Sequence, residues 1–141
     1  MLKNYRKDLP FFQFHSLQKF SDQIEHAVLA RAGGFSRKPF DSLNVSFTVD
    51  DNASDVLKNR QAICEAFALK ENRLIAANQT HSKKVKIITE EVLDGHQAHV
   101  DIDNFDAFIT NVPNVALMIK VADCQTLLMF DPVKKVIAAV H

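Results

Sequence analysis

Residues 126–140 read Thr126-Leu127-Leu128-Met129-Phe130-Asp131-Pro132-Val133-Lys134-Lys135-Val136-Ile137-Ala138-Ala139-Val140. Two apolar segments flank Asp131-Pro132-Val133-Lys134, in which proline occupies the second position of a turn. Each segment is short, apolar and rich in residues that favour extended backbone. We therefore predict a strand on either side of the turn, the second of them running to the end of the chain at His141.

Similar short segments occur upstream and predict further strands, because each is apolar or β-branched and is bounded by polar turns. These segments are Phe11–Phe14, Ile24–Arg31, Leu74–Ala77, Val85–Ile88, Ala107–Thr110 and Val115–Val121. One helix is predicted after Asn52 or Ser54, since either residue can cap it and apolar residues follow at three- and four-residue spacing. Strands outnumber helices, so the predicted class is mixed α/β, in the broad sense that includes α+β folds.

The length, charge and composition of the chain argue against some classes of function. The chain has 141 residues, of which 17 are basic and 17 acidic, and 47% are hydrophobic. This length fits one domain, and the zero net charge argues against dedicated nucleic-acid binding. The longest uncharged apolar stretch, Val112–Ile119, is far shorter than the roughly 18 residues that a membrane span needs. Without a secretory signal, we expect a cytoplasmic protein with no membrane partner.

Three residues that can act as soft or borderline metal ligands lie at or near the ends of predicted strands, namely His81, Cys124 and His141. Strand ends in one sheet lie about 5 Å apart, so Cys124 and His141 can face one cleft. Three nitrogen and sulfur ligands with a fourth position left to water would form a catalytic zinc site. The alternative is a buried thiol and two hydrogen-bonded histidines, and the spacing leaves both interpretations open.

Other polar residues also allow two interpretations each. Arg60 falls on the apolar face of the predicted helix, where its guanidinium needs either Asp50 or Asp51 as a partner or a substrate phosphate. Asp123 is either a general acid or base, or an acceptor of backbone hydrogen bonds at a turn. Cys64, on the helix, is expected to act as a small hydrophobic residue.

A set of short motifs resembles one known family when the motifs are read in order. They are Arg31-Ala32-Gly33-Gly34-Phe35-Ser36, Ser42-Leu43-Asn44, Val49-Asp50-Asp51, Asn59-Arg60, Gln79-Thr80-His81, Asp106-Ala107-Phe108-Ile109-Thr110, Ala122-Asp123-Cys124 and Ala138-Ala139-Val140-His141. Together they resemble the laccase-domain family, also called the multicopper polyphenol oxidase family and described as purine nucleoside phosphorylases. The resemblance runs from about Ile24 to His141 and leaves residues 1–23 outside. It implies that residues 1–141 are the N-terminal part of one laccase-like domain.

The resemblance implies a fold, a cofactor and an activity. The fold is an α/β sandwich of mixed β-sheets with flanking helices, and the cofactor is zinc held by His81, Cys124 and His141. The activity is phosphorolysis of adenosine, inosine and methylthioadenosine together with deamination of adenosine, so the expected partners are a nucleoside and phosphate. Asp123 and Arg60 are the expected catalytic residues. Substrate binding is expected of Arg31, Gly33, Gly34, Ser36, Asn44 and Gln79.

Two other functions remain open. The older family label implies copper-dependent oxidation of phenols, but a multicopper oxidase needs paired His-x-His ligands and this chain contains no such pair. The family also carries a label for editing of peptidoglycan precursors. Because the family normally continues with Ala-Gly-Trp-Arg-Gly where this sequence ends, we expect the fold to be incomplete at its C-terminus, with a missing segment or a second chain completing the sheet.

Overall fold

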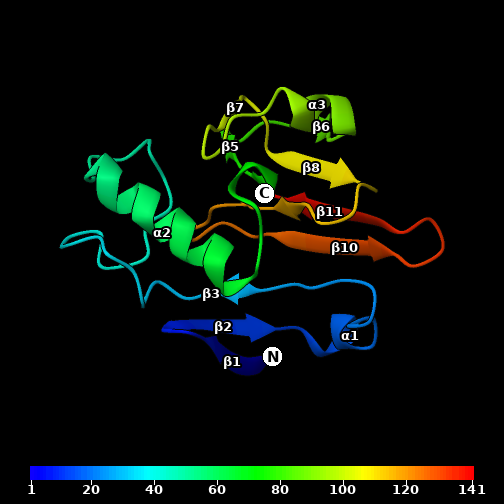
Figure 1. Ribbon diagram of the computed structural model, residues 1–141, viewed down its shortest axis with the longest axis horizontal. Coiled ribbons are helices and arrows are strands. Elements are labelled where there is room, and N and C mark those ends of the chain that lie inside the picture. Colours follow the sequence, from blue (N-terminus) through cyan, green and yellow to red (C-terminus); the bar gives the residue numbers. More distant parts are fainter. The chain divides into compact units, whose positions relative to one another are not determined.

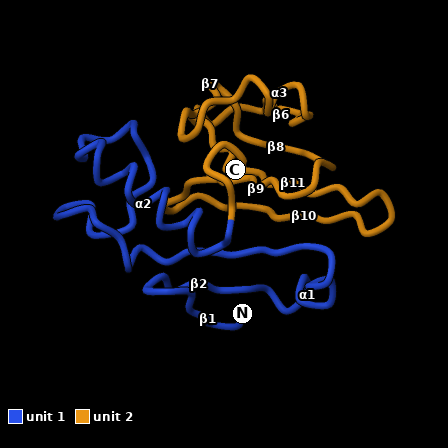
Figure 2. The backbone as a smooth tube through the Cα atoms, viewed as in Figure 1, with its two compact units in different colours: residues 1–68 blue, residues 69–141 orange.

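The computed structural model describes all residues from Met1 to His141, and they form two compact units. Unit 1 comprises Met1–Ala68 and unit 2 comprises Leu69–His141 (Figure 2). The three candidate metal ligands all belong to unit 2. The expectation that residues 1–141 form one domain stays a prediction.

Unit 1 begins with a small antiparallel sheet in the order β1-β2-β3 (Figure 1). Its strands are β1 (Leu2–Arg6), β2 (Leu9–Gln13) and β3 (Val28–Leu29), and the short helix α1 (His15–Gln18) follows β2. The strand predicted over 24–31 is therefore too long, since only two of its residues pair with β2. Side chains replace the backbone ladder next to it: Gln13 Nε2 donates to the His26 carbonyl, and the Phe14 amide donates to His26 Nε2.

The long helix of unit 1, α2 (Ala53–Ala66), confirms the predicted helix, and of the two predicted caps the structure has Asn52, whereas Ser54 lies inside the helix. Asn52 occupies the N-cap, and its side-chain oxygen accepts a 2.9 Å hydrogen bond from the Ser54 amide. Such a bond satisfies one of the amides that the first helical turn leaves without a partner. Cys64 lies on the buried face of α2, only 2% exposed, as expected for a small hydrophobic residue.

The main sheet of unit 2 has the order β10-β11-β8-β6. Its strands are β6 (Val85–Ile87), β8 (Ala107–Thr110), β10 (Leu127–Asp131) and β11 (Val136–Val140). β10 and β11 form an antiparallel hairpin, β11 pairs antiparallel with β8, and β8 pairs parallel with β6 (Figure 1). The mixed sheet therefore contains both strands predicted around the Asp131 turn.

Two pairs of short parallel strands complete unit 2, with the 3-10 helix η1 (Glu71–Arg73) and the helix α3 (Glu90–Asp94). The first pair is β4 (Leu74–Ile75) with β9 (Ala116–Leu117), and the second is β5 (Ala77–Asn78) with β7 (Ile102–Asp103). The single strand predicted over 74–77 is thus two strands that change partner at Ala76. The strand predicted over 115–121 also shortens to β9, because Lys120 pairs with a side chain instead of a strand.

The core of unit 2 lies around Phe108 on β8, which is 0% exposed. The buried residues packed with it are Ile75, Ala77, Ile88, Leu93 and Val115. None of the helices is long and apolar enough to cross a lipid bilayer. The predicted mixed α/β class, with mixed sheets and few helices, is confirmed.

Candidate metal centre

Three segments of unit 2 bring His81, Cys124 and His141 together. One ligand atom from each residue lies within 4.8 Å of the other two. His81 Nε2 is 3.8 Å from Cys124 Sγ, and the rings of His81 and His141 meet edge to face with centroids 4.9 Å apart. Zinc bonds of about 2.0–2.3 Å keep tetrahedral ligand atoms roughly 3.3–3.6 Å apart, so small side-chain rotations would close the set around an ion.

Strand ends and loops supply these ligands. His81 follows β5, Cys124 lies in the loop between β9 and β10, and His141 directly follows β11. His81 and Cys124 are exposed, whereas the imidazole of His141 is only 7% exposed. The set is therefore open to solvent on one side, as a site that admits a substrate must be.

Asp106 lies behind the two histidines, immediately before β8, and is 1% exposed. Its Oδ1 is 2.9 Å from His141 Nδ1 and accepts a 3.0 Å bond from the His81 amide. Its Oδ2 accepts from the amides of Thr80 and Ser82 at 3.2 and 2.7 Å. Burial alone would raise the pKa of the Asp106 carboxyl, but the hydrogen bonds from His141, Ser82 and Thr80 outweigh it and hold that pKa well below its usual range.

Gln79 anchors the loop that carries the cysteine. Its Nε2 donates to the Lys120 carbonyl and its Oε1 accepts from the Lys120 amide, both at 2.8 Å. This amide group thus copies the paired bonds of a β-ladder and fixes the backbone four residues before Cys124. Substrate binding by Gln79 stays a prediction, and the structure shows that its amide is already engaged with the main chain.

Asp123 is exposed in the same loop as Cys124. The remaining predicted site residues, Arg31, Gly33, Gly34, Ser36, Asn44 and Arg60, belong to unit 1. Their catalytic and substrate-binding roles stay predictions. Within unit 1, each of them has structural contacts of its own.

The two glycines permit close approaches in the loop after β3. Gly33 has a φ of +90°, and a Cβ there would lie 2.4 Å from the Asp8 carbonyl oxygen. A Cβ on Gly34 would lie 2.2 Å from the Ser42 carbonyl oxygen. Both positions therefore require glycine for the fold of unit 1 itself.

The buried side chain of Asn59 on α2 forms hydrogen bonds with the loop that follows β3. Its Nδ2 donates to the Ser36 hydroxyl at 2.9 Å and to the Asn44 carbonyl at 2.7 Å, while its Oδ1 accepts from the Phe35 amide at 2.7 Å. The Asn44 side chain donates to Asp51 at 2.8 Å and lowers the pKa of that carboxyl. Ser36 and Asn44 therefore have structural contacts of their own.

The two arginines differ in exposure. The Arg31 side chain is 74% exposed, and its Nε donates to the Asp41 carbonyl at 2.7 Å. Arg60 is 1% exposed: its Nε and one terminal nitrogen donate to the Val45 carbonyl at 2.8 and 2.6 Å, and its guanidinium lies 4.4 Å from the centre of the Phe47 ring. A backbone carbonyl and an aromatic face are thus among the groups that contact this buried cation.

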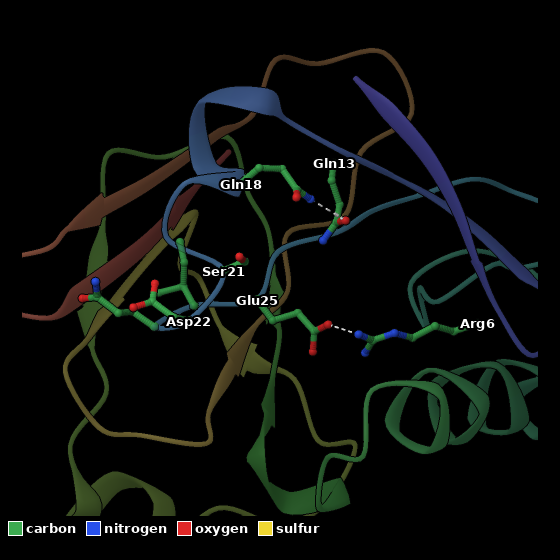
Figure 3. A pocket seen from close by; sticks show the side chains of 8 residues that line it. Arg6, Gln13, Gln18, Ser21, Asp22 and Glu25 are labelled. Atoms are coloured by element: carbon green, nitrogen blue, oxygen red, sulfur yellow. Dashed lines mark hydrogen bonds and ion pairs between the residues drawn. The ribbon is translucent and has the colours of Figure 1, made fainter.

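A polar depression of about 470 Å³ also lies in unit 1 (Figure 3). Arg6 and Glu25 form an ion pair on its wall, and Gln18 Nε2 donates to Gln13 Oε1 at 2.7 Å. None of the predicted site residues lines it. Four of its polar side chains are paired with one another in these two contacts, and it contains none of the candidate metal ligands, so the ligand set of unit 2 remains the candidate functional site.

Sequence reasoning assigned no role to Asp106, although its motif was part of the family resemblance. The available signal was an aspartate placed directly before a buried apolar strand, where a carboxylate needs hydrogen-bond partners.

Comparisons with known proteins give a consistent result. The model of the family described as "Multi-copper polyphenol oxidoreductase laccase" matches residues 25–141. A protein of Bacillus subtilis (strain 168) named purine nucleoside phosphorylase YlmD is 36% identical over 111 residues, which are 77% of this chain and 40% of the relative. A purine nucleoside phosphorylase of Mycobacterium bovis is 33% identical over 121 residues, 86% of this chain and 46% of the relative. The chain thus spans about half the length of the curated relatives it matches.

A solved structure shares the fold. The crystal structure of the hypothetical protein YfiH of Bacillus licheniformis has a TM-score of 0.81 at 23% identity, and the match covers 95% of this chain and 49% of that one. At this identity the similarity concerns the fold alone, and it agrees with the mixed α/β class.

Proposed function

The chain belongs to the multi-copper polyphenol oxidoreductase laccase family, and on that basis we propose that it is part of a metal-dependent purine nucleoside phosphorylase. The observation that carries the proposal is the convergence of His81, Cys124 and His141. The substrate class is supported by relatives named purine nucleoside phosphorylase. The proposal includes adenosine, inosine and methylthioadenosine as substrates, and deamination of adenosine as a second reaction.

The donor set fits zinc, since two imidazoles and one thiolate are ligands that zinc prefers and a set of three leaves a coordination position open. When bound, zinc would supply a Lewis acid at the exposed side of the set. His141 would contribute Nε2, because its Nδ1 is engaged with Asp106. Cys124 would bind as the thiolate.

The phosphorolysis step requires a phosphate oxygen to attack the ribose carbon that carries the base. The bond from that carbon to the purine nitrogen breaks, and the nitrogen takes up a proton to give the free base and a ribose phosphate. We propose exposed Asp123 as the proton donor. We retain Arg31 and Arg60 as candidate phosphate ligands, each to be tested by substitution. Deamination would instead add water to the purine carbon that bears the amino group and release ammonia.

A pair of cysteine variants tests the proposal. Cys124→Ala removes an exposed candidate ligand, whereas Cys64→Ala removes a buried thiol of unit 1 and is the matched control. We expect Cys124→Ala to lose its bound metal, measured by elemental analysis. We also expect it to lose the activity that releases free base from inosine and adenosine in phosphate buffer. The control, Cys64→Ala, should keep both its bound metal and its phosphorolysis activity. Phosphorolysis at the wild-type rate by folded Cys124→Ala would contradict the proposal.

Copper-dependent phenol oxidation is the second candidate, because two histidines and a cysteine also form the ligand set of mononuclear copper sites. Metal analysis and phenol oxidation measured on the same preparations separate the two. Copper at one equivalent with oxidation of phenols, and no release of free base from nucleosides, would favour this second function.

A further inference from the structure

We propose that Asp106 is a positioning residue that orients two candidate metal ligands, His81 and His141, with a single carboxylate. The inference rests on the proposed metal site and extends it to a residue that does not itself reach the ion. It follows from the hydrogen bonds of Asp106, its burial and the backbone conformation of His81.

The first contact fixes the ring of His141. Asp106 Oδ1 lies 2.9 Å from His141 Nδ1, and the Asp106 carbonyl accepts the His141 amide at 2.7 Å. An ionised carboxylate only accepts hydrogen bonds, so Nδ1 must carry the proton and the neutral ring presents its lone pair at Nε2. A carboxylate behind a metal-binding histidine fixes both the tautomer and the ring orientation in this way.

The second set of contacts fixes the backbone of His81. This residue has a φ of +57°, in the left-handed region that non-glycine residues rarely adopt. The amides of Thr80, His81 and Ser82 nevertheless all point at the Asp106 carboxylate, at 3.2, 3.0 and 2.7 Å. Three successive amides around one anion form a nest, which offsets the conformational cost at His81.

The carboxylate is saturated by these contacts. Its two oxygens offer about four acceptor positions, and three amides together with the ring of His141 take all four. Because Asp106 is 1% exposed, water cannot replace a lost partner freely. Movement of the His141 ring or of the His81 backbone would therefore take a hydrogen bond away from a buried charge, which couples the positions of the two residues to each other.

The competing interpretation is that Asp106 merely stabilises the turn at residues 80–82. That role predicts a change in stability when Asp106 is replaced, but no change in the zinc affinity of a folded variant. The positioning role predicts a change in zinc affinity and in the tautomer of His141.

The experiment compares Asp106→Asn with Asp131→Asn in the full chain. The control removes a charge of the same type from the β10–β11 turn, where Asp131 accepts from the amides of Val133 and Lys134 at 2.9 and 3.0 Å. Affinity for Zn²⁺ alone is measured by competition with a chromophoric chelator, with Cys124→Ala as the reference for a broken site. Circular dichroism establishes that each variant is folded.

We expect Asp106→Asn to bind Zn²⁺ about 10–100-fold more weakly than the wild type, the range seen when partners of metal ligands are removed. Asp131→Asn should bind like the wild type. Wild-type affinity in Asp106→Asn combined with loss in Cys124→Ala would overturn the role of Asp106 and leave the metal site standing. Equal affinity in the wild type and Cys124→Ala would overturn the metal site itself, and with it any role of Asp106 toward a metal.

A measurement on the unsubstituted protein covers the case in which Asp106→Asn fails to fold. Nitrogen NMR of the metal-free chain at neutral pH distinguishes the two imidazole tautomers. We expect His141 to carry its proton on Nδ1, facing Asp106. A ring protonated mainly on Nε2 would overturn the proposal without use of any variant.

Discussion

Replacing Gln79 by alanine separates two roles for this residue, a contact with substrate and an anchor for the cysteine loop. The substitution removes two 2.8 Å hydrogen bonds to the half-buried backbone of Lys120. Each is worth about 1 kcal/mol net, and both bonds go to half-buried backbone groups, which adds to the loss, so we expect a decrease of about 2–3 kcal/mol in the free energy of unfolding. For a domain of this size, that corresponds to a fall in Tm of about 5–10 °C.

The assay combines thermal unfolding of the metal-free protein with a Zn²⁺ titration. We expect Gln79→Ala to lose both stability and zinc affinity, because Cys124 is attached to the backbone that Gln79 holds. Gln97→Ala is the control, since Gln97 is an exposed glutamine of the same unit and should change stability by less than about 0.5 kcal/mol. Unchanged Tm and zinc affinity in Gln79→Ala, with a raised KM for nucleoside, would refute the anchoring role and favour a contact with substrate.

Two further substitutions test unit 1. Gly34→Ala should cost about 1–3 kcal/mol of stability, because its Cβ would lie 2.2 Å from the Ser42 carbonyl oxygen, whereas Gly95→Ala has no atom closer than 3.9 Å to meet and should be tolerated. Chemical denaturation measures both, and equal stability of the two variants would contradict the loop geometry. Arg60→Ala should lower stability by about 2–4 kcal/mol, since it removes a buried cation and leaves the half-buried Val45 carbonyl without its charged donor. If folded Arg60→Ala also shows an unchanged KM for phosphate, Arg60 is not the predicted phosphate ligand.

Local signals in the sequence were sufficient for the elements that depend on nearby residues. The turn at Asp131 and the flanking apolar segments predicted β10 and β11, and the two possible caps, Asn52 and Ser54, predicted the start of α2 to within two residues. Partner changes are not local, so the segment 74–77 was assigned one strand although it pairs first with β9 and then with β7. The polar strand β1 was missed because its side chains are mostly exposed and lack an apolar pattern.

The candidate site also has parts that could be predicted from the sequence and parts that could not. His81, Cys124 and His141 are 43 and 17 residues apart, which is no recognised zinc spacing, and only the family resemblance favoured them over the alternative of separate, hydrogen-bonded residues. The structure brings the three together because β8 and β11 pair and because Gln79 binds the backbone of Lys120. The role proposed for Asp106 depends on backbone amides and on the conformation of His81, and neither is visible in a string of residue types.

X-ray absorption at the metal edge tests the central claim most directly, that His81, Cys124 and His141 bind one metal ion. With one equivalent of Zn²⁺ bound to the purified protein, the claim predicts one sulfur at about 2.3 Å and two imidazole nitrogens at about 2.0–2.1 Å. The sulfur signal should disappear in Cys124→Ala and persist in Cys64→Ala. Zinc bound by oxygen and nitrogen alone in the wild type would contradict the account.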